Sequence, residues 1–362
     1  MANLRETQIS DTGFLRLPRG TTAERPSSAQ EGQLRFNSET RNLEYYDDAY
    51  SAWFPSDYLP PTASSTGGDT VTDITQGGVN YRVHIFPRVG RALFTVSRPG
   101  PVEFLIVAGG GSGGGGLGAG GGAGGVLIGT TTVYTGTYDI RVGAGGTPIL
   151  GGRSQTGLSG NSGGNSSALG FTAIGGGAGG RHRETDTAGK PGGSGGGGGV
   201  ITASPNPGGS GTPGQGNSGG TAPIHNGSLG NNWPGGGGGG AASPGESPID
   251  SNSAGGKGGN GIAVSITGSV QFFAGGGGGA SYTRAAGAGD GGIGGGGGGS
   301  CNTGSAGLGG IGYNNGQNGA VGGQNGGAGG ANTGGGGGGG SWDRTFGGAG
   351  GSGIVIIRYR IS

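Results

Sequence analysis

Cysteine is nearly absent from this sequence, and long apolar runs are absent altogether. Cys301 is the only cysteine among 362 residues, which excludes an intrachain disulfide framework and a cysteine-based zinc site within one chain. No stretch approaches the roughly 18 consecutive apolar residues of a membrane-spanning helix. The N-terminal MANLRETQIS lacks the basic and apolar regions of a signal peptide. We therefore expect a chain that is made and assembled in a cytoplasm.

Positive charge is also scarce. The formal net charge is +1, and Lys190 and Lys257 are the only lysines. A nucleic-acid backbone or an anionic membrane is usually met by a cluster of basic side chains. The sequence offers no such cluster, so we expect no nucleic-acid partner.

Glycine is what the chain has in excess. The 109 Gly and 17 Pro together make up about 35% of the residues, against roughly 12% in ordinary proteins. Only nine of the glycines fall in residues 1–100, which also hold more than half of the charged residues. The chain therefore joins two kinds of sequence, and the first kind alone can bury small conventional cores.

The N-terminal part predicts a small β meander. Leu34 and Phe36, Leu43 and Tyr45, and then Trp53 stand on alternating positions, with turn-type residues between these pairs. A meander of about 25 residues is too small to be stable alone, so we expect self-association. Residues 61–78 are rich in Pro, Ser, Thr and Gly and predict a linker. We thus expect an attachment and oligomerisation module at 1–60, a linker at 61–78 and a glycine-rich domain at 79–362.

Apolar and β-branched runs bracket the glycine-rich interior. Strands are predicted at 81–86, 92–96, 102–108, 125–128, 137–142 and 353–360. Composition alone would favour disorder between them, because few side chains remain to offset chain entropy. Packed polyproline-II helices are the alternative, since the missing Cβ lets backbones approach closely. Runs of four to seven Gly separated by polar segments favour the packed form. The predicted fold class is mostly β and irregular, with a β frame enclosing a glycine-rich bundle of polyproline-II-like helices.

Residues 20–53 resemble a short module that recurs in phage tail fibres and other virion appendages. The resemblance covers about 35 residues and rests on these positions: Gly20, Thr21, Arg25, Pro26, Gly32, Leu34, Arg35, Phe36, Asn37, Leu43, Glu44, Tyr45, Tyr46 and Trp53. The family usually has a two-residue turn before the final Ser and Trp, where this chain has Asp47, Asp48, Ala49 and Tyr50. The resemblance implies attachment to other virion proteins, of the tail or the head.

Residues 79–362 resemble the glycine-rich domain of phage tail fibres and tip adhesins. The matching segments are YRVHIF at 81–86, VEFLIVAGGG at 102–111, AGGVLIG at 123–129, GTYDIRVGAGG at 136–146 and GGSGIVIIRY at 350–359. The similarity extends more loosely to the polyglycine-helix sandwich of T-even-like tip adhesins. In those adhesins glycine helices form a scaffold whose loops touch the host receptor, so the resemblance implies receptor recognition.

Catalytic and metal-binding motifs are not supported. The glycine sites around Lys190 and Lys257 lack the Ser or Thr of a phosphate-binding loop, and GGSGG at 110–114 matches a nucleophile elbow through composition alone. His84, His182 and His225 lie far apart in the sequence, which leaves only a metal site shared between chains. We expect no enzyme activity, no cofactor and no metal.

The informative side chains are large rings isolated among glycines. Trp233, Tyr282, Tyr313 and Trp342 have few apolar neighbours in the sequence, so they either cap the ends of the bundle or stand on loops as binding anchors. Polar neighbours beside the rings suit a sugar or a porin loop. The receptor-binding candidates are Trp233, Tyr282, Arg284, Tyr313, Asn314, Trp342 and Arg344. We expect segments 179–193, 228–234, 280–290, 300–318 and 341–346 to form exposed loops at one end of the bundle.

These observations favour a virion appendage, either a tail fibre or a tip adhesin. It would bind a host surface glycan or outer-membrane protein and form a homotrimer, as such fibres commonly do. The alternative is a structural head fibre or capsid decoration protein without receptor binding. An ice-binding bundle is disfavoured, because the interior threonines keep no common spacing.

Overall fold

A computed structural model describes most of the chain, in two compact units, Met1–Pro61 and Thr62–Ser362. The described residues are 17–47, 51–55, 65–149, 160–182, 187–200, 205–224, 232–282, 286–342 and 345–361. The predicted candidates Arg284 and Arg344 lie outside them.

The first unit contains the predicted meander. Strands β2 (Leu34–Asn37), β3 (Asn42–Asp47) and β4 (Ala52–Pro55) pair in antiparallel order. Strand β1 (Arg19–Gly20) adds a short parallel pairing to β2, and the 3-10 turn η1 (Thr22–Glu24) follows it. The predicted alternation is wrong at its end, because Phe54 pairs with Tyr45 and Trp53 pairs with Tyr46. Trp53 therefore lies on the other face of the sheet from Leu34.

The second unit starts with a frame of two five-stranded sheets. The β16 sheet has the order β10-β9-β16-β7-β6, and the β11 sheet has the order β13-β12-β11-β8-β5. Their strands are β5 (Ser65–Thr66), β6 (Thr70–Gln76), β7 (Val79–Phe86), β8 (Gly90–Val96), β9 (Gly100–Val107), β10 (Val126–Val133), β11 (Gly136–Val142), β12 (Ser166–Ala168), β13 (Phe171–Ala173) and β16 (Ile354–Arg360). Six of these strands were predicted.

The expected linker at 61–78 is the main correction to the predicted layout. Its described part, 65–78, contains β5 and β6, which are edge strands of the two sheets. Strand β6 pairs along its whole length with β7, from Thr70 opposite Ile85 to Gln76 opposite Val79. The Thr and Val residues of β6 suit an exposed edge strand, whereas the prediction gave more weight to the Gly, Pro and Ser around them.

The hydrophobic core lies on both faces of the β16 sheet. Between the two sheets pack side chains from eight strands, including Phe86, Phe94, Ile106 and Ile140. On the opposite face, Leu105 and Ile356 pack against the hairpin of β14 (Ile262–Val264) and β15 (Gln271–Phe273). This double burial accounts for the almost continuous apolar sequence of β16.

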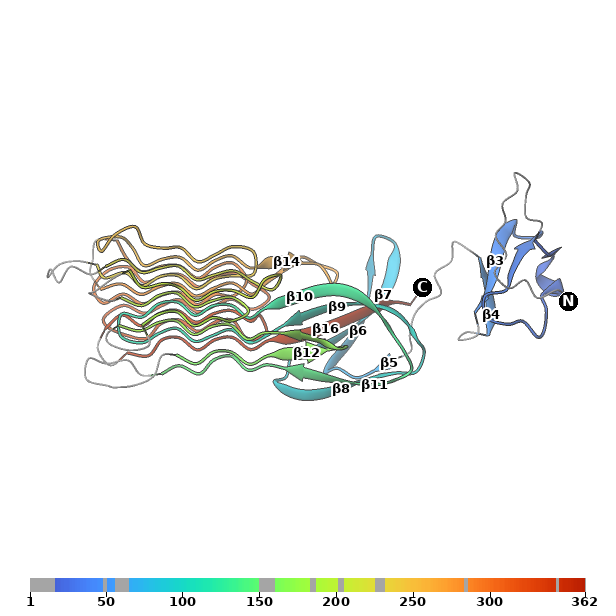
Figure 1. The fold of residues 1–362 in the computed structure, drawn as a ribbon, viewed down its shortest axis with the longest axis horizontal. Helices are drawn as coiled ribbons and strands as arrows, with labels where there is room; N and C mark the ends of the chain where they lie inside the picture. The colour runs from blue at the N-terminus through green and yellow to red at the C-terminus, as the bar shows by residue number, and fades with distance from the viewer. Residues whose placement is uncertain are drawn as a thin grey trace. The chain divides into compact units, whose positions relative to one another are not determined.

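From the frame, the chain passes into a bundle of extended glycine helices that run back and forth (Figure 1). Segment 118–125 shows their geometry. Its N–H groups at 118, 121 and 124 all donate to segment 334–340, and those at 119, 122 and 125 all donate to segment 174–180. A repeat of three residues per turn is the period of a polyproline-II helix. The bundle of polyproline-II-like helices is therefore confirmed.

Each interior helix is bonded to many others. Segment 118–125 donates to three neighbours and accepts from three more, which are 108–114, 194–197 and 277–280. A methyl group at Gly121 would overlap the carbonyl oxygen of Gly111, and one at Gly124 would overlap that of Ala108. Glycine is thus required because backbone occupies the place of a side chain.

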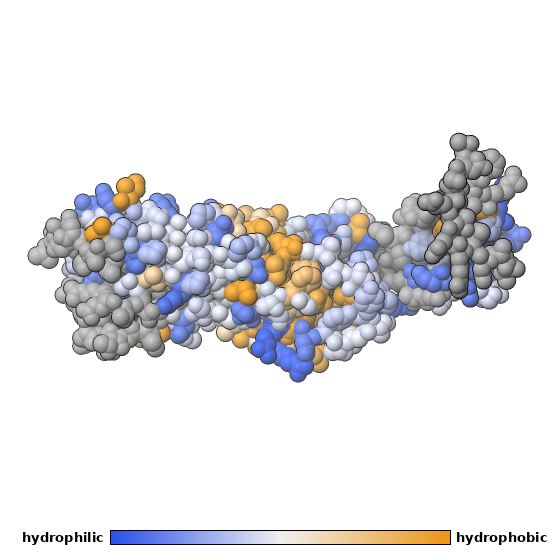
Figure 2. Space-filling model, viewed as in Figure 1, coloured by the Kyte–Doolittle hydropathy of each residue, from blue (hydrophilic) through white to orange (hydrophobic). Residues whose placement is uncertain are grey.

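The surface also differs between the bundle and the frame. On the face seen in Figure 2 the bundle is mostly pale, with blue and isolated orange residues, while apolar residues gather where the bundle meets the frame. The frame therefore supplies the apolar core, and the bundle supplies a long surface with little hydrophobic character.

Candidate functional site

Three of the four predicted rings meet at the end of the bundle that faces away from the frame. Trp233 and Tyr282 stack with ring centroids 5.3 Å apart, and Tyr282 and Trp342 stack at 4.3 Å. Leu117 and Val200 pack against them. The sequence prediction thus selected residues that lie in one cluster, which we call the tip stack.

His182 extends the tip stack and was not predicted as a site residue. Its ring lies 5.9 Å from that of Trp233 at an interplanar angle of 24°. The sequence gave only a weak signal, since this histidine stands among charged residues that are typical of a solvated loop. Its position follows from the bundle, because segment 174–182 leads away from the frame beside segment 118–125.

Hydrogen bonds to backbone carbonyls hold the residues of the tip stack in place. Asn232 and Trp233 both donate their N–H groups to the carbonyl of Ser251, and Tyr282 donates to the carbonyl of Asn232. The hydroxyl of Thr345 donates to the carbonyl of Trp342 at 2.7 Å. Trp233 has a φ of 50°, a left-handed conformation that is uncommon for a bulky residue. The stack is therefore held in place by segments that are distant in sequence.

Exposure differs along the tip stack. Trp233 is only 7% exposed, so it caps the bundle. His182, Tyr282 and Trp342 are half-buried. Of the two roles left open by the sequence, cap and anchor, the burial of Trp233 fits the cap. Only the half-buried rings have surface to offer a ligand.

Tyr313 and Asn314 lie at the other end of the bundle. The Tyr313 ring packs on Phe273 at 5.4 Å, and its N–H donates to the carbonyl of Phe272 next to β15. Asn314 is exposed and donates to the carbonyl of Ala331. The expectation that all of 300–318 lies at one end is therefore wrong. The segment runs the length of the bundle, so its two ends lie far apart.

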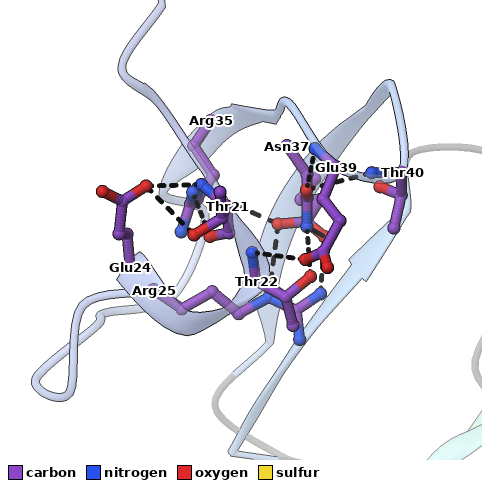
Figure 3. Close-up of polar contacts among 9 residues, drawn as sticks. Thr21, Thr22, Glu24, Arg25, Arg35, Asn37, Glu39 and Thr40 are labelled. Carbon is purple, nitrogen blue, oxygen red and sulfur yellow. Dashed lines mark hydrogen bonds and ion pairs between the residues drawn. The ribbon is translucent and has the colours of Figure 1, made fainter.

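A second concentration of polar groups lies in the first unit (Figure 3). Glu44 is 1% exposed and accepts hydrogen bonds from Arg25 and from Asn37 Nδ2. Arg35, 4% exposed, places Nε 3.9 Å from the same carboxylate and donates Nη2 to the carbonyl of Thr21 at 2.8 Å. One face of this small sheet therefore buries polar and charged side chains.

Electrostatics keep Glu44 charged. Burial by itself raises the pKa of its carboxyl, but the hydrogen bonds from Arg25 and Asn37 and the charges of Arg25 and Arg35 outweigh burial and lower the pKa overall. Two guanidinium groups thus share one buried carboxylate. Arg35 also attracts Glu24, and Arg25 attracts Glu39, so the two guanidinium groups of the cluster face three carboxylates.

A third group, inside the frame, looks like a nucleophile and its base. His84 Nε2 lies 3.1 Å from Ser65 Oγ and 3.3 Å from Tyr359 Oη, and Nδ1 lies 2.7 Å from the carbonyl of Gly67, to which it donates. His84 is fully buried between the sheets. Burial lowers its pKa, against the opposing effect of the bond to Gly67. His84 has no exposed surface, and the group forms a buried hydrogen-bond network that holds β5.

Among the described residues no three His, Cys, Asp or Glu side chains come close enough to hold a metal ion. None of their helices is long and apolar enough to span a membrane.

Comparison with known families agrees with this architecture. A profile of the glycine-rich domain matches residues 89–324, about two thirds of the chain. The chain belongs to the glycine-rich domain family. The match begins beside β8 and ends within the bundle, whereas β7 and β16, which complete the central sheet of this glycine-rich domain, lie outside it. A comparison with curated proteins returns no match.

Proposed function

We propose that this glycine-rich protein is a virion appendage subunit, a tail fibre or tip adhesin, that binds a host-cell surface receptor through the tip stack. The observation that carries the proposal is the gathering of Tyr282 and Trp342, half-buried, with His182 at the free end of a rigid bundle. A scaffold that holds aromatic rings in fixed positions lowers the entropy lost on binding. The resemblance of both units to tail-fibre modules supports the same reading.

The receptor class follows from the side chains at this end. Aromatic rings beside hydrogen-bonding groups suit a surface glycan or a loop of an outer-membrane protein. In this proposal the first unit binds other virion proteins and the chain assembles as a homotrimer. Its place is the virion, and it acts by binding, without a catalytic step or a cofactor.

Alanine variants test the role of the tip stack. Tyr282→Ala and Trp342→Ala should weaken binding of the purified chain to host cells by about 1–4 kcal/mol, the range of interface anchors, with a smaller effect on thermal stability. Tyr313→Ala is the matched control, because it removes a stacked ring at the frame end. It should lower the unfolding temperature and leave affinity unchanged. If all three variants lose stability and none loses affinity, the tip stack does not bind a receptor.

A structural head fibre or capsid decoration protein is the second candidate. It is favoured by one observation, the burial of Trp233 within the tip stack, because a ring that caps the bundle needs no receptor. Particles lacking the protein discriminate the two. Loss of particle integrity with normal adsorption to cells supports decoration, and intact particles that no longer adsorb support the adhesin. Immunogold labelling of purified virions tests both, since absence of label contradicts each.

A further inference from the structure

Strand β10 forms a long, uncharged outer edge of the β16 sheet. The edge strands of the two frame sheets are β10, β6, β13 and β5. Strands β5 and β13 have only two and three residues, and β6 carries Asp73 in an ion pair with Arg82. Strand β10 has eight residues, VLIGTTTV, with no charged side chain and no proline, and it pairs with β9 without a bulge. Proteins usually protect a long edge with one of these devices, so the edge of β10 indicates a surface that a partner covers.

The open hydrogen-bonding groups of this edge follow from its register. The N–H of Val126 donates to the carbonyl of Gln215 and therefore points away from β9. Backbone groups alternate in direction along a strand, so those of Ile128, Thr130 and Thr132 also point away from β9. Among the described residues, no backbone group bonds to these three on that side. Another extended chain satisfies such a row of donors and acceptors.

A pocket and an exposed ring lie at opposite ends of the same edge. The pocket, of about 420 Å³, lies at the bundle end, and its walls include Val126, Ile128, Ile262, Gln215 and Asn217. At the other end Tyr134 directly follows the strand, and its side chain is 68% exposed. A phenol ring suits these walls, because its body is apolar and its hydroxyl can bond to a side-chain amide.

The ring and the pocket are complementary under a two-fold axis. When two copies of β10 pair antiparallel with Thr130 opposite its own copy, Ile128 lies opposite Thr132, and every outward residue is paired. The same register places Tyr134 of one copy opposite Val126 of the other, with both side chains on one face of the sheet. Because the N–H of Val126 already has an acceptor, the backbone pairing ends there and only the Tyr134 ring reaches the pocket.

We propose that β10 is a self-association edge, through which two copies of this chain join their β16 sheets into one continuous sheet. The exchange of ring and pocket favours a second copy over a different protein, because both belong to this one edge and a two-fold contact uses each twice. Threonine pairs across antiparallel strands add to its stability. The contact lies away from the tip stack and goes beyond receptor binding. It can join two single chains or two trimers.

Opposite charges at the centre of the edge test this register. In Thr130→Asp two like charges would meet across the axis, so the mass of the full-chain assembly, measured by sedimentation equilibrium, should fall to half. Thr130→Lys should give the same result. An equimolar mixture of the two variants should restore the full mass, because opposite charges then meet. Unchanged mass in the single variants, or no restoration in the mixture, would overturn the proposal.

Thr72 provides the matched control. It is an exposed threonine on β6, the other long edge of the same sheet. Thr72→Asp and Thr72→Lys should leave the mass of the assembly unchanged. Equal loss of mass with the variants at both edges would mean that overall charge sets the association, and would contradict a contact at β10.

Tyr134→Ala tests the ring and its pocket. Losing an aromatic anchor should raise the dissociation constant between the two copies at least about tenfold. The unfolding temperature of the separated chain should not change, because the ring is exposed there. Val270→Ala removes another exposed apolar side chain, next to β15, and should alter the dissociation constant less than twofold. Equal effects of the two variants would contradict the placing of Tyr134 in the pocket.

Discussion

The frame and the bundle of the second unit are continuous in sequence but are stabilised by different forces. In the frame, side chains such as Phe94 and Ile106 fill the space between two sheets. In the bundle, backbone groups fill that space, and a helix such as 118–125 is bonded to six neighbours. Side-chain packing tolerates small losses of volume. Backbone packing leaves no room for an added methyl group, because a carbonyl group of the neighbouring helix already occupies that space.

The comparison also shows why the two parts occur together. Ordering a residue costs about 1–2 kcal/mol of chain entropy, and glycine costs the most. A hydrogen bond returns a net of about 0.5–1.5 kcal/mol. In the bundle by itself, the free energy gained from hydrogen bonds therefore roughly equals the entropy cost of ordering the chain. Strand β9 leads directly into a glycine helix, and β10 and β16 each directly follow one, so the frame fixes the ends and the register of these helices.

The largest expected effect comes from adding one methyl group to the bundle. In Gly336→Ala the new Cβ would overlap the carbonyl oxygen of Gly121, and we expect destabilisation of at least about 3 kcal/mol, the upper part of the range for overpacking. Chemical denaturation of the purified chain measures it. Gly214→Ala is the control, since its Cβ would meet no atom and only the φ of 77° opposes it, at about 1–2 kcal/mol. Equal effects would contradict backbone packing.

Removing one methyl group from the frame should cost less. Ile106→Val deletes one buried methyl between the two sheets, for which about 0.5–1.5 kcal/mol is usual. The same denaturation experiment gives the value. A loss larger than that of Gly336→Ala would reverse the proposed ranking of the two regions.

Acid should weaken the frame before the bundle. The pKa of His84 is lowered in the folded chain by burial, so the unfolded chain binds more protons between that pKa and about 6.5. The contribution of His84 is complete above about pH 6.5 and is lost as pH falls through this window. Backbone amides do not titrate there. Hydrogen exchange should show frame amides losing protection first, and His84→Gln should remove that part of the pH dependence.

Much of this architecture is predictable from the sequence, because strands and glycine helices have local signatures. Six strands of the frame follow from apolar runs, and the glycine runs predict the helices between them. The tip residues Trp233, Tyr282 and Trp342 were found because a large ring among glycines has few places to pack.

The remaining features depend on tertiary context. Strand β6 is exposed and rich in threonine, so its sequence also suits a linker. Tyr313 and Trp342 have similar surroundings in the sequence, and only the direction of each helix decides which end of the bundle they reach. The polar interior around Glu44 breaks the usual alternation, because Arg35 and Asn37 occupy positions where apolar side chains are normal.

The position of β16 has a consequence for synthesis. This strand lies between β7 and β9 and pairs with both, yet it follows β9 by nearly 250 residues. At roughly 5–20 residues per second, a ribosome needs about 12–50 s to make the chain between them. Throughout that time β7 and β9 lack their shared neighbour. The glycine segments made meanwhile carry little apolar surface, so a nascent chain that waits in this state has few groups with which to aggregate.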